Sequence, residues 1–296
     1  MCRFTTLAVL VPVTSFYTGT QAAETELEEA KVAGSEVAEA EPLWELGVGA
    51  GALYGPDYPA SSEHHLRGLA LPYVVYRGDM FRIGDGQTAR AIAYESDRLE
   101  FDLSFLAAFD ADSEHNELRG GMPDIDYLFQ IGPQLTIKLA DFRFEDESHS
   151  RLSLALQARA VFSSDLTRID QRGYVFEPML RYRHYDWLTP NLDVTVSLRP
   201  TWGSEHLHGY FFDVDSEYVT PERVAFSADS GYFGTGLNVY ASYQLTEKSS
   251  VFFGLQTSFH HGAANTNSPL FEDQFTVGFG GGFIWSLFAS ERLVTE

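Results

Sequence analysis

The chain of 296 residues is poor in cysteine, in basic residues and in long apolar runs. Its single cysteine is Cys2, so an exported chain that has lost its N-terminus would contain no disulfide. Lys and Arg total 20 against 42 Asp and Glu, a formal net charge of −22 that excludes a nucleic-acid-binding role. The run Leu7–Val13 is too short for a membrane-spanning helix.

The N-terminus has the layout of a secretory signal. Arg3 precedes the apolar run, and Thr20-Gln21-Ala22 supplies small residues at a cleavage site. We therefore expect a signal peptide over residues 1–22, with a buried N-terminal helix as the alternative. Residues 23–42 contain seven Glu and one Lys without a large apolar face, which predicts an acidic, disordered periplasmic segment. A helix that binds a partner is the alternative for that segment.

From Leu43 onward the chain is rich in Tyr, Phe and Gly, with counts of 15, 23 and 25. Residues 98–109 show the recurring pattern, because Leu99, Phe101 and Leu103 alternate with Glu100 and Asp102. Strict alternation over ten or more residues exceeds the usual strand of a soluble protein and is typical of a transmembrane β-barrel. The same pattern recurs in residues 44–54, 124–139, 151–162, 190–202, 231–245, 250–260 and 273–288.

These segments predict an all-β fold, a transmembrane antiparallel β-barrel over residues 43–288 followed by a C-terminal extension, 289–296. With weaker strands at 66–77, 80–84, 89–95 and 172–184 the count is twelve, and ten is the alternative because the 80–95 hairpin is short. Short turns alternate with long loops, so we expect both termini in the periplasm and the long loops outside. A soluble β-sandwich or lipocalin-like barrel is the alternative fold. The long loops are predicted at 55–65, 110–123, 163–172, 203–230 and 262–272.

Several segments, in their order and spacing, resemble the MipA/OmpV family of outer-membrane proteins. The resemblance covers about residues 44–288 and is carried by Tyr58-Pro59-Ala60-Ser61, Leu71-Pro72-Tyr73, Tyr76-Arg77, Leu118-Arg119-Gly120, Asp124-Ile125-Asp126 and Ser268-Pro269. It implies a non-enzymatic outer-membrane barrel without a cofactor. Some relatives are described as scaffolds that join a murein-cleaving transglycosylase to a murein synthase, and others as porin-like surface antigens.

Charged residues at inward positions of the predicted strands are the candidate functional residues. They carry both signs, so cross-strand ion pairs either line a narrow channel or close the barrel. The predicted lumen-lining residues are Asp102, Asp126, Lys138, Arg151, Arg159, Glu177, Arg181, Arg183, Asp193 and Arg199.

The predicted outer loops hold most of the histidines, which suggests a surface metal site as a minor hypothesis beside ordinary solvated loops. These histidines are His64, His65, His115, His206, His208, His260 and His261. Catalysis by a serine nucleophile needs a serine close to a histidine. The sequence offers two such groupings, Ser61 and Ser62 beside His64 and His65, and His149-Ser150. We expect neither a catalytic nor a metal site, and expect outer-membrane lipid and lipopolysaccharide as neighbours. The sequence thus favours a murein-enzyme scaffold, with a narrow channel, a surface antigen or a metal-responsive protein as alternatives.

Overall fold

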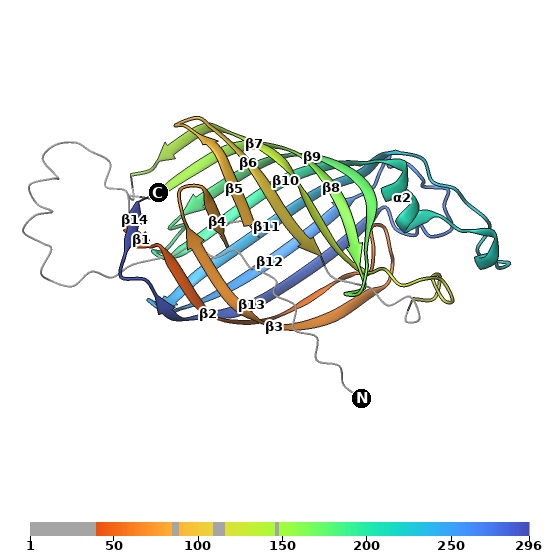
Figure 1. Cartoon of the computed structure of the whole chain (residues 1–296), viewed down its shortest axis with the longest axis horizontal. Helices are drawn as coiled ribbons and strands as arrows, with labels where there is room; N and C mark the ends of the chain where they lie inside the picture. The colour runs from red at the N-terminus through yellow and green to blue at the C-terminus, as the bar shows by residue number, and fades with distance from the viewer. Residues whose placement is uncertain (1–39, 85–88, 109–115, 146–147, 296) are drawn as a thin grey trace, which may run out of the picture.

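The computed structural model describes residues 40–84, 89–108, 116–145 and 148–295. Within them the chain forms one closed, antiparallel, twelve-stranded barrel in which each strand pairs with its neighbour along the chain (Figure 1). The twelve-strand prediction is confirmed and the ten-strand alternative is wrong. The strands of the barrel are β2 (Trp44–Pro56), β3 (His64–Arg77), β4 (Phe81–Ile83), β5 (Ala89–Glu95), β6 (Leu99–Ala108), β7 (Tyr127–Arg143), β8 (His149–Ser164), β9 (Ile169–Tyr185), β10 (Leu192–Gly203), β11 (Gly231–Thr246), β12 (Ser249–Phe259) and β13 (Phe275–Ala289).

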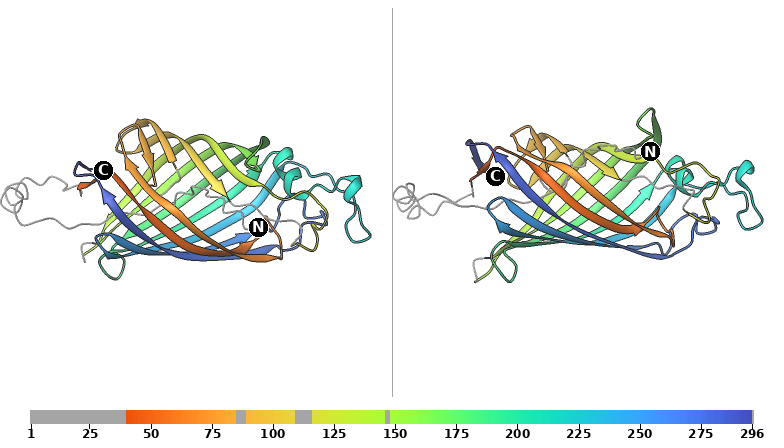
Figure 2. Two further views of the ribbon diagram at one scale, coloured as in Figure 1. Left: turned by 60° about the horizontal axis from the view of Figure 1, so that its bottom comes forward. Right: turned by 90° about the horizontal axis from the view of Figure 1, so that it is seen from below.

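The last strand, β13, closes the barrel by pairing with the first, β2, in a register that runs from Phe279 opposite Tyr54 to Ala289 opposite Glu45. Glycine makes this contact close, since a Cβ on Gly47 would lie 2.1 Å from the carbonyl oxygen of Trp285. Closure leaves the barrel without free edges in this region, which a sheet in lipid requires. The strands run obliquely to the long axis in every view (Figure 2).

The predicted alternation is present in the strands. On β6, Leu99, Phe101 and Leu103 are exposed on the outer face, whereas Glu100 and Asp102 are buried. The start of the predicted strand 124–139 departs from the prediction: Ile125 was expected to face lipid, yet it is 2% exposed. The reason is that β7 begins only at Tyr127, so Ile125 lies in a loop that folds over the barrel mouth.

One end of the barrel, here called the turn end, carries short turns and both ends of the described chain. There β1 (Ala40–Pro42) pairs antiparallel with β14 (Leu293–Thr295) in a two-stranded ribbon outside the barrel. Residues 40–42 of the predicted acidic segment and residues 293–295 of the C-terminal extension are therefore ordered against each other. The predicted signal peptide, 1–22, and residues 23–39 lie outside the described residues.

The opposite end, here called the loop end, carries the long connections. The largest, between β10 and β11, contains the helix α2 (Glu205–Phe212) and the short 3₁₀ helix η3 (Ser216–Tyr218). The loop predicted at 163–172 is shorter than expected, because β8 continues to Ser164 and β9 starts at Ile169. Among the described residues no helix is long and apolar enough to cross a membrane.

Candidate functional site: the barrel interior and its loop-end cap

A hydrophobic core closes the loop end of the barrel. Its members come from β7, β8, β9, β11, α2 and four loops, and we call this core with its supporting loops the cap. Phe212 and Leu270 at its centre are 1% and 0% exposed. Side chains buried this fully pack against their neighbours as in a protein interior. The core consists of Tyr58, Ile125, Leu128, Val161, Val175, Leu207, Phe211, Phe212, Val214, Ala228, Phe233 and Leu270.

Two buried arginines join the loop 116–123 to the segment that contains α2. Arg119 donates hydrogen bonds to the carbonyl oxygens of Phe211 at 3.2 Å and Pro123 at 3.0 Å, and its guanidinium lies over the ring of Tyr58. Burial lowers the pKa of Arg119. Arg223 donates to the carbonyl oxygens of Tyr218 at 2.8 Å and Gly120 at 3.2 Å. These bonds satisfy loop carbonyls that the cap removes from water.

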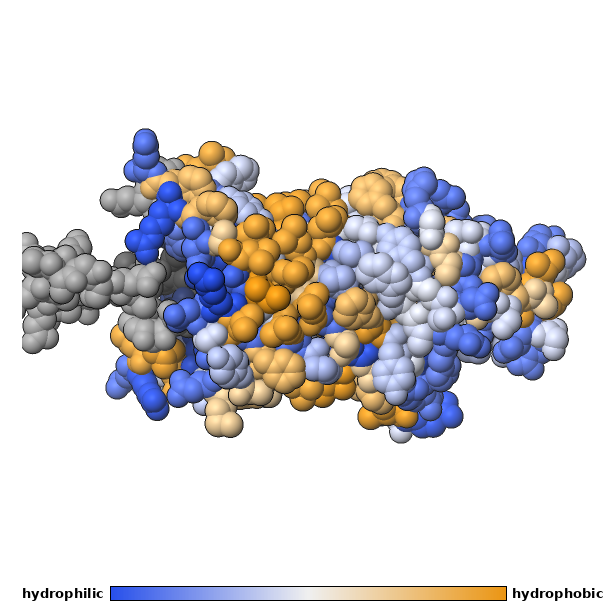
Figure 3. Space-filling model, turned by 90° about the horizontal axis from the view of Figure 1, so that it is seen from above, coloured by the Kyte–Doolittle hydropathy of each residue, from blue (hydrophilic) through white to orange (hydrophobic). Residues whose placement is uncertain are grey.

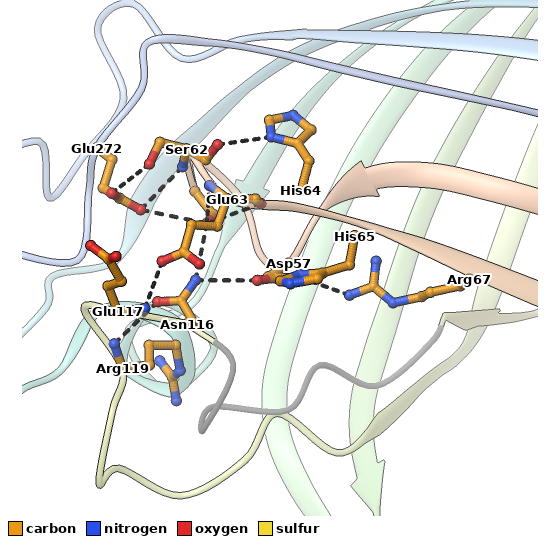
Figure 4. Close-up of polar contacts among 11 residues, drawn as sticks. Asp57, Ser62, Glu63, His64, His65, Arg67, Asn116, Glu117, Arg119 and Glu272 are labelled. Carbon is orange, nitrogen blue, oxygen red and sulfur yellow. Dashed lines mark hydrogen bonds and ion pairs between the residues drawn. The ribbon is translucent and has the colours of Figure 1, made fainter.

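The segment 55–65 is the third support of the cap (Figure 4). The carboxylate of Asp57 accepts hydrogen bonds from His65 at 2.7 Å, Arg67 at 2.9 Å and Asn116 at 3.2 Å. Glu272, from the loop between β12 and β13, accepts a bond from the hydroxyl of Ser62 at 2.6 Å. The polar residues of this segment therefore tie three loops together.

His208 on α2 fixes the helix to β11 and to the 262–272 loop. Its Nε2 donates to the carbonyl oxygen of Gly231 at 3.0 Å, and its Nδ1 accepts from the side-chain amide of Asn265 at 2.9 Å. The ring stacks on Phe233 with centroids 3.6 Å apart. Burial lowers the pKa of His208. Both ring nitrogens have a hydrogen-bond partner only when the ring is neutral, because a protonated ring has two donors and no acceptor for the amide of Asn265.

Below the cap, a charged cluster crosses the interior between β8, β9 and β10. Glu177 pairs with Arg159 on β8 and with Arg199 on β10, the latter at 3.4 Å, and it accepts a hydrogen bond from Thr201 at 3.1 Å. Glu177 and Arg159 are each 5% exposed. Strand alternation places all four side chains on the inner face, where opposite charges compensate the cost of burial.

The ten residues singled out by the sequence lie at different heights of the interior. Asp102 is buried and accepts a bond from Gln134 at 3.0 Å, and Arg183 pairs with Asp193 at 3.0 Å. The structure therefore brings Arg159, Glu177 and Arg199 together, and brings Arg183 to Asp193, but it does not gather all ten into one site. The remaining four are Asp126, which pairs with Arg172 near the cap; Arg151, which pairs with Asp141 near the turn end; and Lys138 and Arg181, which are partly buried.

A cavity of about 780 Å³ remains inside the barrel, and we call it the chamber. Its wall is formed by glycines of β2, β11, β12 and β13, such as Gly49, Gly236, Gly254 and Gly280. Glu177, Arg199 and Thr201 of the charged cluster form part of the opposite wall. Glycine leaves this space because it adds no side chain to the inner face of a strand.

Two observations bear on the metal hypothesis and on the serine–histidine grouping. Within the residues that the structure describes, no three His, Cys, Asp or Glu side chains lie together as a metal site. The hydroxyl of Ser62 bonds to Glu272, and His64 contacts the carbonyl oxygen of Ser62 instead of its hydroxyl. His115 lies outside the described residues.

The outer face of the barrel carries the features of a membrane protein. An apolar belt crosses the side seen in Figure 3, and polar residues predominate toward the loop end. Outward aromatic rings meet across strands toward the loop end, as the aromatic girdle of a membrane barrel does at the lipid–water boundary. The ring pairs are Tyr54–Phe279, Phe105–Phe129, Phe129–Phe162, Phe176–Trp202, Trp202–Tyr232 and Phe259–Phe275.

The closed barrel, the alternating faces and the aromatic girdle define an outer-membrane β-barrel protein. Comparison with known protein families matches residues 48–287 to the family MipA, described as "MltA-interacting protein MipA". The chain belongs to the MipA family, as the resemblance of its motifs indicates.

Solved structures resemble the chain in fold alone. They include a bacterial polysaccharide outer membrane secretin, with a TM-score of 0.32 and 8% identity over 82% of this chain and 99% of that chain. An outer membrane channel of Pseudomonas putida F1 has a TM-score of 0.35 and 12% identity over 85% and 98% of the two chains. The Pseudomonas putida toluene transporter TodX has a TM-score of 0.28 and 10% identity over 98% and 79%. No curated protein matches the sequence.

Sequence reasoning missed the cap. Arg119 and Tyr58 belong to the motifs that carry the family resemblance, but nothing local in the sequence shows that they stack 5.6 Å apart. A signal for α2 was present in "EHLHGYFF", where Leu207, Phe211 and Phe212 recur at helical spacing within a loop otherwise rich in acids.

Proposed function

We propose that this protein is a non-enzymatic, non-conducting barrel of the outer membrane, and that its turn end faces the periplasm and holds murein-processing enzymes there. The family description supports the proposal, since it names an interaction with MltA. Lipid surrounds the apolar belt. The acidic loop end lies among lipopolysaccharide, whose phosphates it meets through divalent cations.

The observation that carries the proposal is the anchoring of the acidic segment at the turn end. Arg77 is 4% exposed and pairs with Glu41 at 2.5 Å and with Glu45 at 3.0 Å. It also donates a hydrogen bond to the carbonyl oxygen of Pro42 at 2.9 Å. The ribbon of β1 and β14 continues this attachment. The described chain therefore begins at a fixed point on the barrel rim, and in our proposal the acidic residues 23–39, which precede that point in the sequence, are the segment that a partner enzyme recognises.

The interior supports a barrel that does not conduct. The apolar core of the cap lies at its loop end, and a second apolar cluster of Tyr73, Val75 and Ile284 with Phe252 lies on the far side of the chamber. An ion that crossed the barrel would have to lose its hydration shell against these side chains, which costs many times the thermal energy.

The test is capture of a purified MltA-type murein transglycosylase by the full-length protein in lipid nanodiscs. We expect capture by the wild type and its loss on deletion of residues 24–39. A matched control keeps the same residues in scrambled order, which retains the charge. Retention by the scrambled variant shows that charge is recognised, and its loss shows that the order of residues is recognised.

Planar-bilayer recording separates the scaffold from the channel. The wild-type barrel is expected to be silent. Steady single-channel steps that change ion selectivity when Arg199 is replaced by Gln would contradict a closed barrel and favour the channel. Equal capture by the wild type and the deletion variant would refute the acidic segment as the docking site.

A further inference from the structure

Apolar side chains bound the chamber on its loop-end side and on its turn-end side. Leu207, Phe211 and Phe233 of the cap line it toward the loop end, and Tyr73, Phe252 and Ile284 line it toward the turn end. Its volume of about 780 Å³ lies within the range of small-molecule sites, roughly 300–1,000 Å³.

The lining of the chamber suits a mostly apolar molecule with one hydrogen-bond donor. Most of its surface is glycine backbone, aromatic ring or aliphatic side chain. The side-chain oxygen of Gln130 lines it, is buried, and has no hydrogen-bond partner among the residues described. A buried acceptor without a donor is costly, so a ligand that supplies an N–H or O–H group gains a favourable contact there.

The wall has a weak seam between β9 and β10. Pairing of these strands stops after Leu198 opposite Leu180 and resumes at Trp202 opposite Phe176. At about 3.4 Å per residue, the interrupted stretch is roughly 14 Å long. Its register places Pro178 opposite Pro200.

The two prolines explain the interruption. In an antiparallel ladder, alternate facing pairs exchange two N–H···O bonds, but neither proline has an amide hydrogen to donate. Lipid supplies no substitute donor to the carbonyl groups that remain. The seam is therefore the stretch of the β9–β10 ladder that parts with the least loss of hydrogen bonds.

Features on both sides of the wall fit a path through this seam. On the inner side, Thr201 of β10 donates a hydrogen bond to Glu177 of β9, and Arg199 of β10 forms an ion pair with it. Side chains therefore connect the two strands where the backbone pairing is interrupted. All three line the chamber. On the outer side, Phe176 and Trp202 border a second cavity of about 500 Å³, which shares Val175 with the chamber.

We propose that the chamber binds small, largely apolar molecules carrying a hydrogen-bond donor, and that they enter from the lipid by parting of β9 and β10 at Pro178 and Pro200. This role is separate from periplasmic scaffolding, since it uses neither the acidic segment nor the ribbon. The loop-end cap then serves to keep the chamber dry.

The first experiment tests the chamber with N-phenyl-1-naphthylamine, an apolar probe that has one N–H group and fluoresces in apolar surroundings. Its saturable binding to the barrel in nanodiscs is measured against empty nanodiscs. Gly254 lines the chamber and has open space where a Cβ would stand, so the side chain of Gly254→Trp has room to start into the chamber. We expect the affinity of this variant for the probe to fall about tenfold or more, because the added side chain takes up space that the probe needs. Gly68→Trp is the matched control, because Gly68 is exposed on β3 with equally open surroundings.

The second experiment tests the seam by stopped-flow loading of the same probe. Pro178→Cys with Pro200→Cys places two thiols at facing positions, whose expected Cα separation of about 5.5 Å permits a disulfide. We expect oxidation to slow loading by about an order of magnitude or more, and a reductant to restore the rate. The control, Leu180→Cys with Leu198→Cys, links the same strands on the same face where the ladder is intact, and it should load at the wild-type rate.

A further variant needs no oxidation: Pro178→Val with Pro200→Val restores both amide donors and should also load slowly. Unchanged loading in the oxidised Pro178 and Pro200 cysteine variant and in the valine variant would overturn entry through the seam. Equal probe affinity in the wild type and in Gly254→Trp would overturn the chamber as the binding site. Capture of the murein enzyme is read out separately, so failure here leaves the proposed scaffold untouched.

Discussion

His208 holds α2 in the cap through one tautomer of its ring. The Nε2 hydrogen is donated to Gly231, and the lone pair of Nδ1 receives the amide hydrogen of Asn265. A second proton on Nδ1 would face that amide donor and break the bond. Burial lowers the pKa of His208 below its ordinary value of 6.5, so the detached cap binds the proton more readily than the packed one.

The cap is therefore expected to loosen in acid. The free energy that holds it is complete above pH 6.5 and decreases as the pH falls through the lowered pKa of His208. Hydrogen exchange of residues 205–228, expressed as protection relative to the unfolded chain at about pH 7.5 and at about pH 5, measures this. We expect lower protection at about pH 5, because one hydrogen bond worth about 1 kcal/mol is lost. His208→Gln keeps a donor and an acceptor without titrating, so it should reduce the difference. An equal acid response in that variant would assign the effect to another group.

At the scale of elements, the close contact of β13 with β2 depends on Gly47. A Cβ at this position would lie 2.1 Å from a backbone oxygen, which cannot rotate away as a side chain can. We expect Gly47→Ala to destabilise the folded barrel by about 1–3 kcal/mol or more. Urea unfolding in lipid vesicles measures the loss. Gly68→Ala, with nothing within 4 Å of the added atom, should leave the midpoint unchanged, and equal midpoints for both variants would disprove the steric argument.

The strands were predictable from sequence because lipid and lumen impose a period of two on every one of them. Even β9, read only as a weak strand, follows this rule, with Phe176 and Leu180 exposed and Glu177 buried. The contacts of the interior were less accessible. Glu177 meets Arg159 on one neighbouring strand and Arg199 on the other, and this requires the register of both pairings. Alternation gives the face of each residue and does not give that register.

At the scale of the whole molecule, three layers lie along the axis: the turn-end ribbon, the belt with its chamber, and the cap. The belt was predictable because its signal is local and repeated. The cap was not, since Tyr58, Ile125 and Leu270 join its core from loops far apart in the chain. Ile125 shows the difference, because its local pattern predicts a lipid-facing strand residue while its long-range contacts bury it.

The last prediction concerns the apolar belt, which should lie within the lipid bilayer. Leu198 is exposed on the outer face of β10, four residues from Trp202 of the aromatic girdle and six from the start of the strand. Leu66 is 71% exposed near the loop end of β3. In a membrane barrel an outward arginine costs about 2–4 kcal/mol at the bilayer midplane and about 0–1 near the interface. Leu198→Arg should therefore destabilise the barrel in vesicles far more than Leu66→Arg, as measured by urea unfolding. If the surroundings of Leu198 were water, the two substitutions would cost the same, and the belt would not be the lipid-facing zone.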